Sequence, residues 1–498
     1  MRKKQSYRQK GTAARKHRVP IVKGMMIMKQ KMIALMLAAL LLLGLAACGT
    51  DGKNSETHGA DAQSGQTGAS EGSSGMLFAR DEMEEAGTYF YVKDFRGEFV
   101  QSVRFTDSLK DAPRNAADVS ALQDGSVLLW YEEHDSLYDV TIGAEGGVKA
   151  NPNSKWMFGG LRRAVSIDLN NLDTSGVTSM SEMFAEDLNL TSLDLSLLNT
   201  SSVTDMSSMF YFCKSLPGID VSSFDTSNVV NMTRMFDTAF QKEINVSGLN
   251  TENVQGMTAM FQQNNVTSLD LSSFQTGKLE FMADMFAKCD DLVELDLSNF
   301  DTSHVVNMLG LFYGCEGLRS VDLSSFDTSR VTNMGDMFAY CKSLTQLDLS
   351  NFNTGAVKVF TGMFGNCAVT ELNLSGFDTS SATNMEIMFE YCKGLRSLDL
   401  SGFDTSSTTT MEGMFRGCDA LTELNISGFQ TGSVTSMKNM FASCESLTEL
   451  DLSGWDLSAL RTARSMFENC EALTDLHGEL KLPEDCDTDY MYEHSGLE

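Results

Sequence analysis

One unit is repeated along the chain from Met157 to Phe467, and this repetition constrains the fold more than any other feature. A Met-Phe pair, or a near equivalent, returns every 25 or 26 residues. Self-similarity at a fixed period of this length is typical of a solenoid, in which each repeat stacks on the next. Solenoids present extended surfaces, so the pattern favours a binding protein over an enzyme. The repeated phenylalanine lies at Phe158, Phe184, Phe210, Phe236, Phe261, Phe286, Phe312, Phe338, Phe364, Phe389, Phe415, Phe441 and Phe467.

The first half of each repeat has the pattern of a half-buried strand. In the repeat that begins at Leu292, apolar and polar residues alternate through Leu295, Asp296 and Leu297. A period of two places alternate side chains on opposite faces of a strand. Strands of successive repeats are therefore expected to stack in parallel, about 4.8 Å apart, with their leucines in a shared core.

The second half of each repeat predicts a short helix. Val305, Met308, Leu311, Phe312 and Cys315 lie at offsets of 0, 3, 6, 7 and 10, which places them on one helical face. A threonine precedes this segment in nearly every repeat, where its hydroxyl could cap the first turn. This threonine lies at Thr174, Thr200, Thr226, Thr251, Thr276, Thr302, Thr328, Thr354, Thr379, Thr405 and Thr431.

These patterns predict an α/β solenoid over residues 156–476, with about 13 rungs of 25–26 residues, each a strand plus a short helix. Residues 76–155 contain short β-like runs separated by turns, and we expect them to form a β-rich N-terminal cap over the exposed edge of the first rung. Met491 and Tyr492 follow the last Met-Phe pair by 25 residues, so residues 477–498 are expected to form a decayed closing rung or cap.

The repeat carries a family resemblance. It reads L-x-x-L-D-L-S-x-F-D-T-S-x-V-T-x-M-x-x-M-F-x-x-C and extends from about Trp156 to Leu476. This unit resembles that of the BspA-like leucine-rich-repeat surface proteins of bacteria. The resemblance implies a leucine-rich-repeat solenoid displayed at the cell surface for adhesion, and some relatives bind host matrix proteins or other bacteria. Many relatives carry a C-terminal sorting signal, and this sequence has no LPxTG-like motif.

Residues 1–47 have the pattern of a targeting segment. A positive stretch precedes an apolar run at residues 32–43, which is too short to span a membrane. The run ends in L-A-A-C at Cys48, which looks like a bacterial lipobox with Cys48 as the lipid-bearing residue; an ordinary signal peptide with a chance cysteine is the alternative. Residues 48–75 are rich in Gly and Ser and predict a flexible tether after that cysteine. We therefore expect the protein on the bacterial cell surface, anchored to the membrane by lipid on Cys48.

An aspartate recurs on the strand face opposite the core, and the sequence leaves its role open. Like charges stacked about 5 Å apart repel, so something must offset the repulsion. One alternative is a solvated strip with Asp–Ser hydrogen bonds, and the others are a cation site, Ca²⁺ included, or a docking face for a basic partner. Asparagine replaces the aspartate at Asn245, Asn373 and Asn425. The candidate strip is Asp270, Asp296, Asp322, Asp348, Asp399 and Asp451.

Nine cysteines lie three residues after a repeat phenylalanine, from Cys213 to Cys470. Zinc sites need tight local spacing such as C-x-x-C, which this sequence lacks. Buried thiols at the same place in successive rungs act as small apolar filler. We therefore expect a reduced, buried thiol ladder and no confident metal site.

Charge and motifs limit the function classes. The chain has 67 Asp and Glu against 38 Lys and Arg, a field that repels nucleic acid and favours basic protein partners. Phosphate-binding loops, nucleophile elbows and zinc-protease motifs are absent from the sequence, so we expect no cofactor. The prediction is a lipid-anchored surface protein that binds protein or cell-surface ligands without catalysis, as an adhesin. A structural spacer or scaffold of the envelope without a specific ligand is the alternative, and an enzyme is a remote one.

Overall fold

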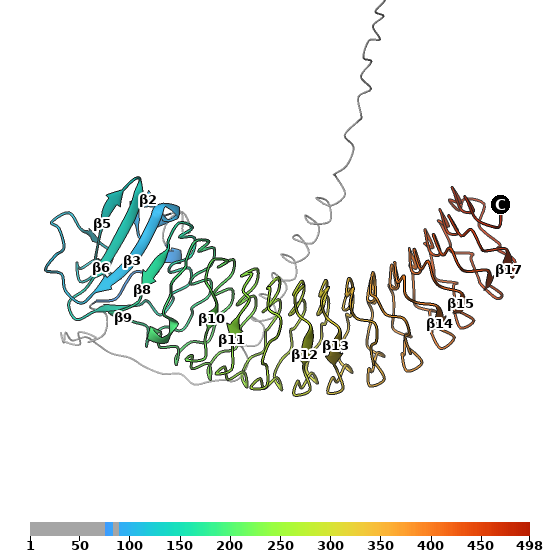
Figure 1. Ribbon diagram of the computed structural model, residues 1–498, viewed down its shortest axis with the longest axis horizontal. Helices are drawn as coiled ribbons and strands as arrows, with labels where there is room; N and C mark the ends of the chain where they lie inside the picture. Colours follow the sequence, from blue (N-terminus) through green and yellow to red (C-terminus); the bar gives the residue numbers. More distant parts are fainter. Residues whose placement is uncertain (1–74, 83–88) are drawn as a thin grey trace, which may run out of the picture. The chain divides into compact units, whose positions relative to one another are not determined.

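The computed structural model describes residues 75–82 and 89–498. The predicted signal segment, Cys48 and the tether before residue 75 lie outside the described residues. Within the described part, a small β-sheet is followed by a row of rungs in sequence order (Figure 1).

A five-stranded sheet at the N-terminal end runs directly into the first rung. Its spatial order is β4-β5-β6-β3-β8. The three inner strands, β5, β6 and β3, span Leu128–His134, Leu137–Gly143 and Val100–Thr106, and β4 is Ala117–Asp118. The last strand, β8 (Ser166–Asp168), belongs to the repeat region and pairs in parallel with β3. The sheet therefore hydrogen-bonds to the strand edge of the first rung.

Short elements complete this region. Strands β1 (Tyr89–Phe90) and β2 (Val92–Arg96) pair antiparallel, whereas β7 (Val148–Lys149) and β9 (Leu172–Asp173) pair in parallel. Two single 3-10 turns, η1 and η2, span Arg80–Glu82 and Gly97–Phe99, and a third, η3, spans Leu195–Leu197.

Short parallel strand pairs mark the repeats. In β12, Leu295 is buried between the exposed Glu294 and Asp296, as the alternation of the sequence predicts. The pairs join β10 to β11, β12 to β13, β14 to β15 and β16 to β17. Their bounds are Ile219–Asp220, Ile244–Asn245, Glu294–Asp296, Ser320–Asp322, Ser397–Asp399, Glu423–Asn425, Glu449–Asp451 and Asp475–His477.

Every rung is also bridged to the next at a second point. Parallel backbone bridges connect equivalent residues along the whole stack, which fixes the register from rung to rung. The chain therefore has a repeat fold. The bridged residues are Asn153, Ser179, Asp205, Asn231, Gly256, Phe281, Asn307, Asn333, Val359, Asn384, Thr410, Ser436, Thr462 and Asp487.

The predicted short helices are wrong, because the described residues contain no α-helix. The segment expected to be helical is a series of consecutive turns, which we name the turn ribbon. Alternate N–H groups of the ribbon donate to the next rung: Met308 N to Asn333 O at 3.0 Å and Phe312 N to Met337 O at 2.9 Å. An α-helix would keep these N–H groups inside the segment. The ribbon uses them to join rungs.

Two residues per ribbon adopt the left-handed conformation, two positions before and two after the repeat phenylalanine. Gly310 and Gly314 have φ of 60° and 71°, and Asp336 and Tyr340 have φ of 54° and 62°. The resulting four-residue period buries side chains at offsets close to those of a helical face. The apolar pattern alone therefore could not separate a helix from the ribbon.

The predicted helix-capping role of the threonine is wrong as well. Thr302 is buried, and its Oγ1 donates to Asp327 O at 2.9 Å and accepts from Asp327 N at 2.9 Å. The Thr302 hydroxyl therefore satisfies both backbone groups of one residue in the following rung, and the equivalent threonines also donate to a carbonyl of the next rung, as Thr354 does to Asp378 O at 2.9 Å. The threonine ladder links rungs, as the ribbon does.

The core is organised by a continuous aromatic stack. Rings of successive repeat phenylalanines lie nearly parallel, from 5.3 Å between the centroids of Phe158 and Phe184 to 6.0 Å between those of Phe338 and Phe364. The stack ends on Tyr492, 5.7 Å from Phe467, so the last segment contributes a ring as well. Each ring is buried only because its neighbours cover both faces, which no single rung could achieve.

Arg80 closes the N-terminal edge of the ribbon ladder. In the second rung, the carbonyls of Met183 and Ala185 accept N–H groups from the first rung. The first rung has the cap in place of a preceding rung, and Arg80 Nη1 donates to the equivalent carbonyls, Gly159 O at 2.8 Å and Met157 O at 3.4 Å. Burial lowers the pKa of Arg80 to about 10, well above neutrality. A buried guanidinium therefore replaces the N–H donors of a missing rung.

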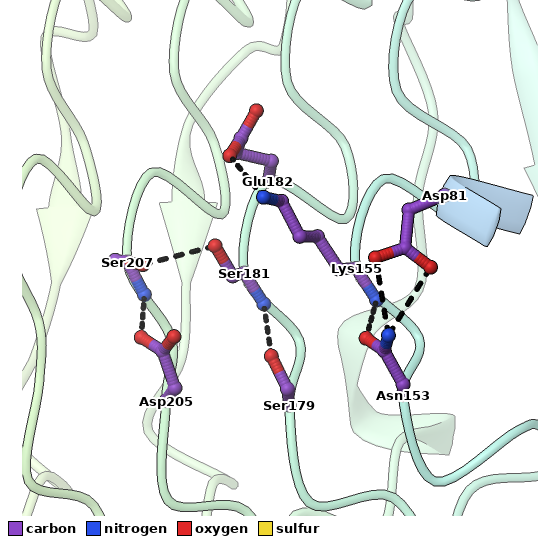
Figure 2. A network of polar contacts seen from close by, with 8 residues as sticks. All are labelled: Asp81, Asn153, Lys155, Ser179, Ser181, Glu182, Asp205 and Ser207. Atoms are coloured by element: carbon purple, nitrogen blue, oxygen red, sulfur yellow. Dashed lines mark hydrogen bonds and ion pairs between the residues drawn. The ribbon is translucent and has the colours of Figure 1, made fainter. Parts of the chain in front are cut away.

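The residue after Arg80 extends this closure. Asn153 Nδ2 donates to both oxygens of Asp81 at 3.1 Å (Figure 2). Lys155 then pairs with Glu182 of the second rung at 3.5 Å. Polar contacts thus tie the cap to the first rung and the first rung to the second, in addition to the sheet.

Candidate functional site

The aspartate strip lies on the exposed side of the rung strands. Asp296 of β12 pairs in register with Asp322 of β13, and both are exposed. The six predicted strip residues are therefore brought onto one face, interrupted by asparagines at equivalent positions, as with Asp399 beside Asn425.

Each strip carboxylate accepts a hydrogen bond from the serine two residues later. Asp296 Oδ1 accepts from Ser298 N at 2.9 Å, and Asp451 Oδ1 accepts from Ser453 N at 2.8 Å. Asn245 makes the same turn through its side-chain oxygen at 3.2 Å. The geometry agrees with the hydrogen-bonded alternative that the sequence left open.

These bonds also dominate the electrostatics of the strip. Hydrogen bonds from the following serine stabilise the carboxylate form and hold the pKa below its ordinary value. For Asp322, repulsion from Asp296 acts in the opposite direction and is the smallest contribution. Mutual repulsion is therefore weaker than local hydrogen bonding. The pKa is lowered at Asp220, Asp270, Asp296, Asp322, Asp348, Asp399 and Asp451.

One group on this face could hold a metal ion. Ligand atoms of Glu449, Asp475 and His477 lie within 4.8 Å of one another, and all three residues are exposed. The register of β16 and β17 produces the group, because it pairs Glu449 with Asp475 and places His477 two residues along the same face. The sequence signal was a histidine in place of the strip aspartate, at the start of the segment expected to be a decayed closing rung or cap.

The nine rung cysteines are buried, and none of them forms a disulfide in the described chain. Cys486 is also free but is half-buried. Their thiols do more than fill space. Cys315 Sγ donates to Phe286 O at 3.0 Å, and Asn264 replaces the thiol with an amide that donates to Phe236 O at 2.7 Å. Burial raises the pKa of Cys289 to about 12, so the reactive thiolate is disfavoured.

Aromatic side chains gather at a position that is half-buried in most rungs and exposed at Tyr340, and sequence reasoning missed it. We name the two residues after each repeat phenylalanine the ribbon edge. Because the segment was taken for a helix, these positions were given no common face. In the ribbon they follow one another from rung to rung, and they carry Tyr211, Phe212, Tyr313, Tyr340 and Tyr391.

Arginines cover several tyrosines of the turn ribbon. The guanidinium of Arg234 lies 4.5 Å from the ring centroid of Tyr211, and that of Arg416 lies 5.6 Å from Tyr391. Arg464 lies 4.8 Å from the ring of Tyr490, at a left-handed position two residues before the closing Tyr492. A cation over a tyrosine face is thus a recurrent arrangement in this chain.

The predicted lipid anchor at Cys48 lies outside the residues that the structure describes. Among residues 75–82 and 89–498, no helix has the length and apolar character needed to cross a bilayer.

Comparison with protein families gives repeated matches over the rung region. Four overlapping segments, 153–274, 217–318, 280–398 and 393–496, match the family described as "Mycoplasma protein of unknown function, DUF285". The chain belongs to this family. The DUF285 matches cover the rungs from the first bridged residue to the closing rung and support a repeat protein.

Other comparisons add little to the family assignment. No curated protein matches this DUF285 chain. One solved structure that matches is the Toll–Spatzle complex of Drosophila, with 16% identity and a TM-score of 0.20. The match covers 68% of this chain, and this chain spans only 39% of that one.

Proposed function

We propose that this DUF285 protein is a bacterial surface lipoprotein whose leucine-rich-repeat-like, BspA-type solenoid binds proteins of other cells or of the host matrix. The observation that carries the proposal is the set of aromatics on the ribbon edge, of which Tyr340 is exposed and the others are half-buried, because tyrosine and tryptophan are enriched at the centres of protein interfaces. The strip face offers mainly aspartate, glutamate, asparagine and serine, and tight binding there lacks such aromatic anchors. The acidic charge of the chain favours basic partners.

The lipid anchor is tested at Cys48. The full chain expressed in bacteria should partition into detergent with the membrane fraction and incorporate labelled fatty acid. Cys48→Ala should abolish both. Equal membrane retention of this variant, with no label on the wild-type chain, would show that the signal acts without lipidation.

Binding is tested on the same protein. The biotinylated full chain is offered to immobilised host matrix proteins and to whole bacteria, and saturable binding to at least one is expected. A folded chain that binds none of them supports the second candidate, an envelope spacer. The uninterrupted stack from Phe158 to Tyr492 favours that candidate, because a continuous ladder gives a rigid rod without requiring a ligand.

A cation on the aspartate strip is a further part of the proposal, with Ca²⁺ as the first choice for carboxylate oxygens. Thermal melts in calcium and in EDTA test it. A calcium-dependent rise in Tm that Asp322→Asn reduces supports a cation strip. Identical melts in calcium and in EDTA would exclude a cation on the strip. The hydrogen bonds to serine would then explain how the stacked aspartates are stabilised.

A further inference from the structure

Tyr340 differs from the other ribbon tyrosines in what covers it. It is 40% exposed, and its ring meets the ring of Tyr313 edge-on at 5.4 Å between centroids. In the described chain, no arginine or lysine lies over the ring of Tyr340, whereas Tyr211 and Tyr391 each carry an arginine of the chain itself. The ring is therefore available to a cation from outside.

The neighbouring rungs place no aromatic ring at the position of Tyr340. The equivalent residue is Gly314 in the preceding rung and Asn366 in the following rung. Neither carries a charge. The next tyrosine, Tyr391, lies two rungs further on and is already covered by Arg416.

A carboxylate flanks the same ring. Asp336 precedes Tyr340 by four residues on the same ribbon, and both have left-handed backbones, with φ of 54° and 62°. A Cβ placed on Gly362 of the next rung would collide with Asp336 Oδ1, so this carboxylate projects along the stack towards that rung. Burial raises the pKa of Tyr340 most, and Glu390 and Asp336 raise it further, which places both carboxylates near the phenol. Glu390 pairs with Arg416 at 3.4 Å, and Lys342 pairs with Glu316.

We propose that Tyr340, with Tyr313 and Asp336, binds an arginine side chain of a basic protein segment. The guanidinium would lie over the tyrosine face, as Arg234 lies over Tyr211 within the chain, and would donate to the Asp336 carboxylate. Arginine fits better than lysine because its planar guanidinium stacks on a ring and donates to a carboxylate at once. This inference rests on the proposed protein-binding function and names the partner's chemistry at one surface.

The test uses the full chain and a fluorescent octapeptide of alternating glycine and arginine, with a glycine–citrulline peptide as the uncharged isostere. Tyr340→Gly removes the ring without straining the backbone, because Gly314 and Gly417 already adopt this conformation at equivalent positions, with φ of 71° and 69°. Fluorescence anisotropy should show binding of the arginine peptide that Tyr340→Gly weakens about tenfold, a loss in the range expected for a cation–π contact. Tyr340→Phe should keep most of the affinity.

Matched controls separate this surface from the general acidity of the chain. Tyr490→Gly removes an exposed left-handed tyrosine that Arg464 already covers, and it should leave affinity unchanged. Asp336→Asn should weaken binding, whereas Asp322→Asn, which removes the same charge from the strip, should have a much smaller effect. Thermal melts of all variants confirm that they are folded.

Several results would overturn the inference. These are equal affinity of Tyr340→Gly and wild type, equal losses in Tyr340→Gly and Tyr490→Gly, equal binding of the citrulline peptide, or no binding of the arginine peptide. If the chain still binds a matrix protein in the panel above and Tyr340→Gly leaves that binding intact, only this inference fails. If neither the peptide nor any protein of the panel binds, the proposed function fails with it.

Discussion

Replacing Arg80 by methionine tests how the first rung is closed. Methionine keeps an apolar side chain of similar length beside Phe90 but cannot donate to the rung carbonyls. Arg80 makes two short charged hydrogen bonds, to Gly159 O at 2.8 Å and Trp156 O at 3.0 Å, and a longer one to Met157 O at 3.4 Å. At about 1.5 kcal/mol for each short bond, the variant should lose roughly 3 kcal/mol. Gly159 O, left without its charged donor, adds to the loss, whereas Trp156 O keeps the N–H of Gly159 at 3.1 Å.

The loss should be local, because each rung of a repeat protein contacts only its neighbours. Hydrogen exchange followed by mass spectrometry should show faster exchange at residues 156–160 and unchanged exchange in the rungs near Phe415. Urea unfolding gives the matching change in stability. Arg96→Met is the control, since Arg96 pairs with Glu98 at 2.8 Å on the exposed surface and should contribute under about 1 kcal/mol. Equal effects of the two substitutions would refute the closure by Arg80.

Three further predictions concern the rungs. Asp187 is buried, and one of its oxygens has no hydrogen-bond partner in the described chain. Burial raises the pKa of Asp187, so its contribution to stability is present at acid pH and is lost as pH rises. Asp187→Asn should therefore raise Tm at neutral pH and have a smaller effect near pH 3. Iodoacetamide followed by peptide mapping should label the half-buried Cys486 first and leave the nine rung thiols unmodified until the chain unfolds, and prompt labelling of those thiols would contradict their burial. Gly310→Ala should lower the free energy of unfolding in urea by about 1–2 kcal/mol, because φ is 60° and the added Cβ meets Asp284. Gly376→Ala, with open space around it, should change that free energy by only about a few tenths of a kcal/mol. Equal effects of the two substitutions would count against the left-handed ribbon.

The period and the strands could be predicted from the sequence because both depend on spacing alone. The 25- or 26-residue step fixes the rung register, and the alternation around Leu295 fixes which side chains enter the core. The buried thiol positions followed from the same register. These features need no knowledge of backbone conformation.

The turn ribbon could not be predicted from its apolar pattern, because helices and four-residue turn pairs bury nearly the same offsets. A weak signal was present: Gly310 and Gly314 lie four apart, as do Gly413 and Gly417 at the same place in a later rung. Paired glycines at that spacing indicate left-handed positions and disfavour a helix. The error then spread to the threonines, which were given a helix to cap.

The ribbon edge was missed for the same reason. Tyr313 and Tyr340 occupy neighbouring places after their phenylalanines, but a helical assignment does not place them on one surface. The contribution of Arg80 also lay beyond sequence reasoning, since it depends on which carbonyls the cap leaves without a rung. Both features follow from hydrogen bonds between rungs, which a single sequence does not display.

The most direct test of the account is the binding of the immobilised full chain to a panel of purified host matrix proteins, measured for wild type, Tyr340→Gly and Tyr490→Gly. The account predicts saturable binding to at least one basic protein, weakened about tenfold in Tyr340→Gly and unchanged in Tyr490→Gly. Absence of saturable binding by the folded wild-type chain, or equal binding by all three, would contradict it.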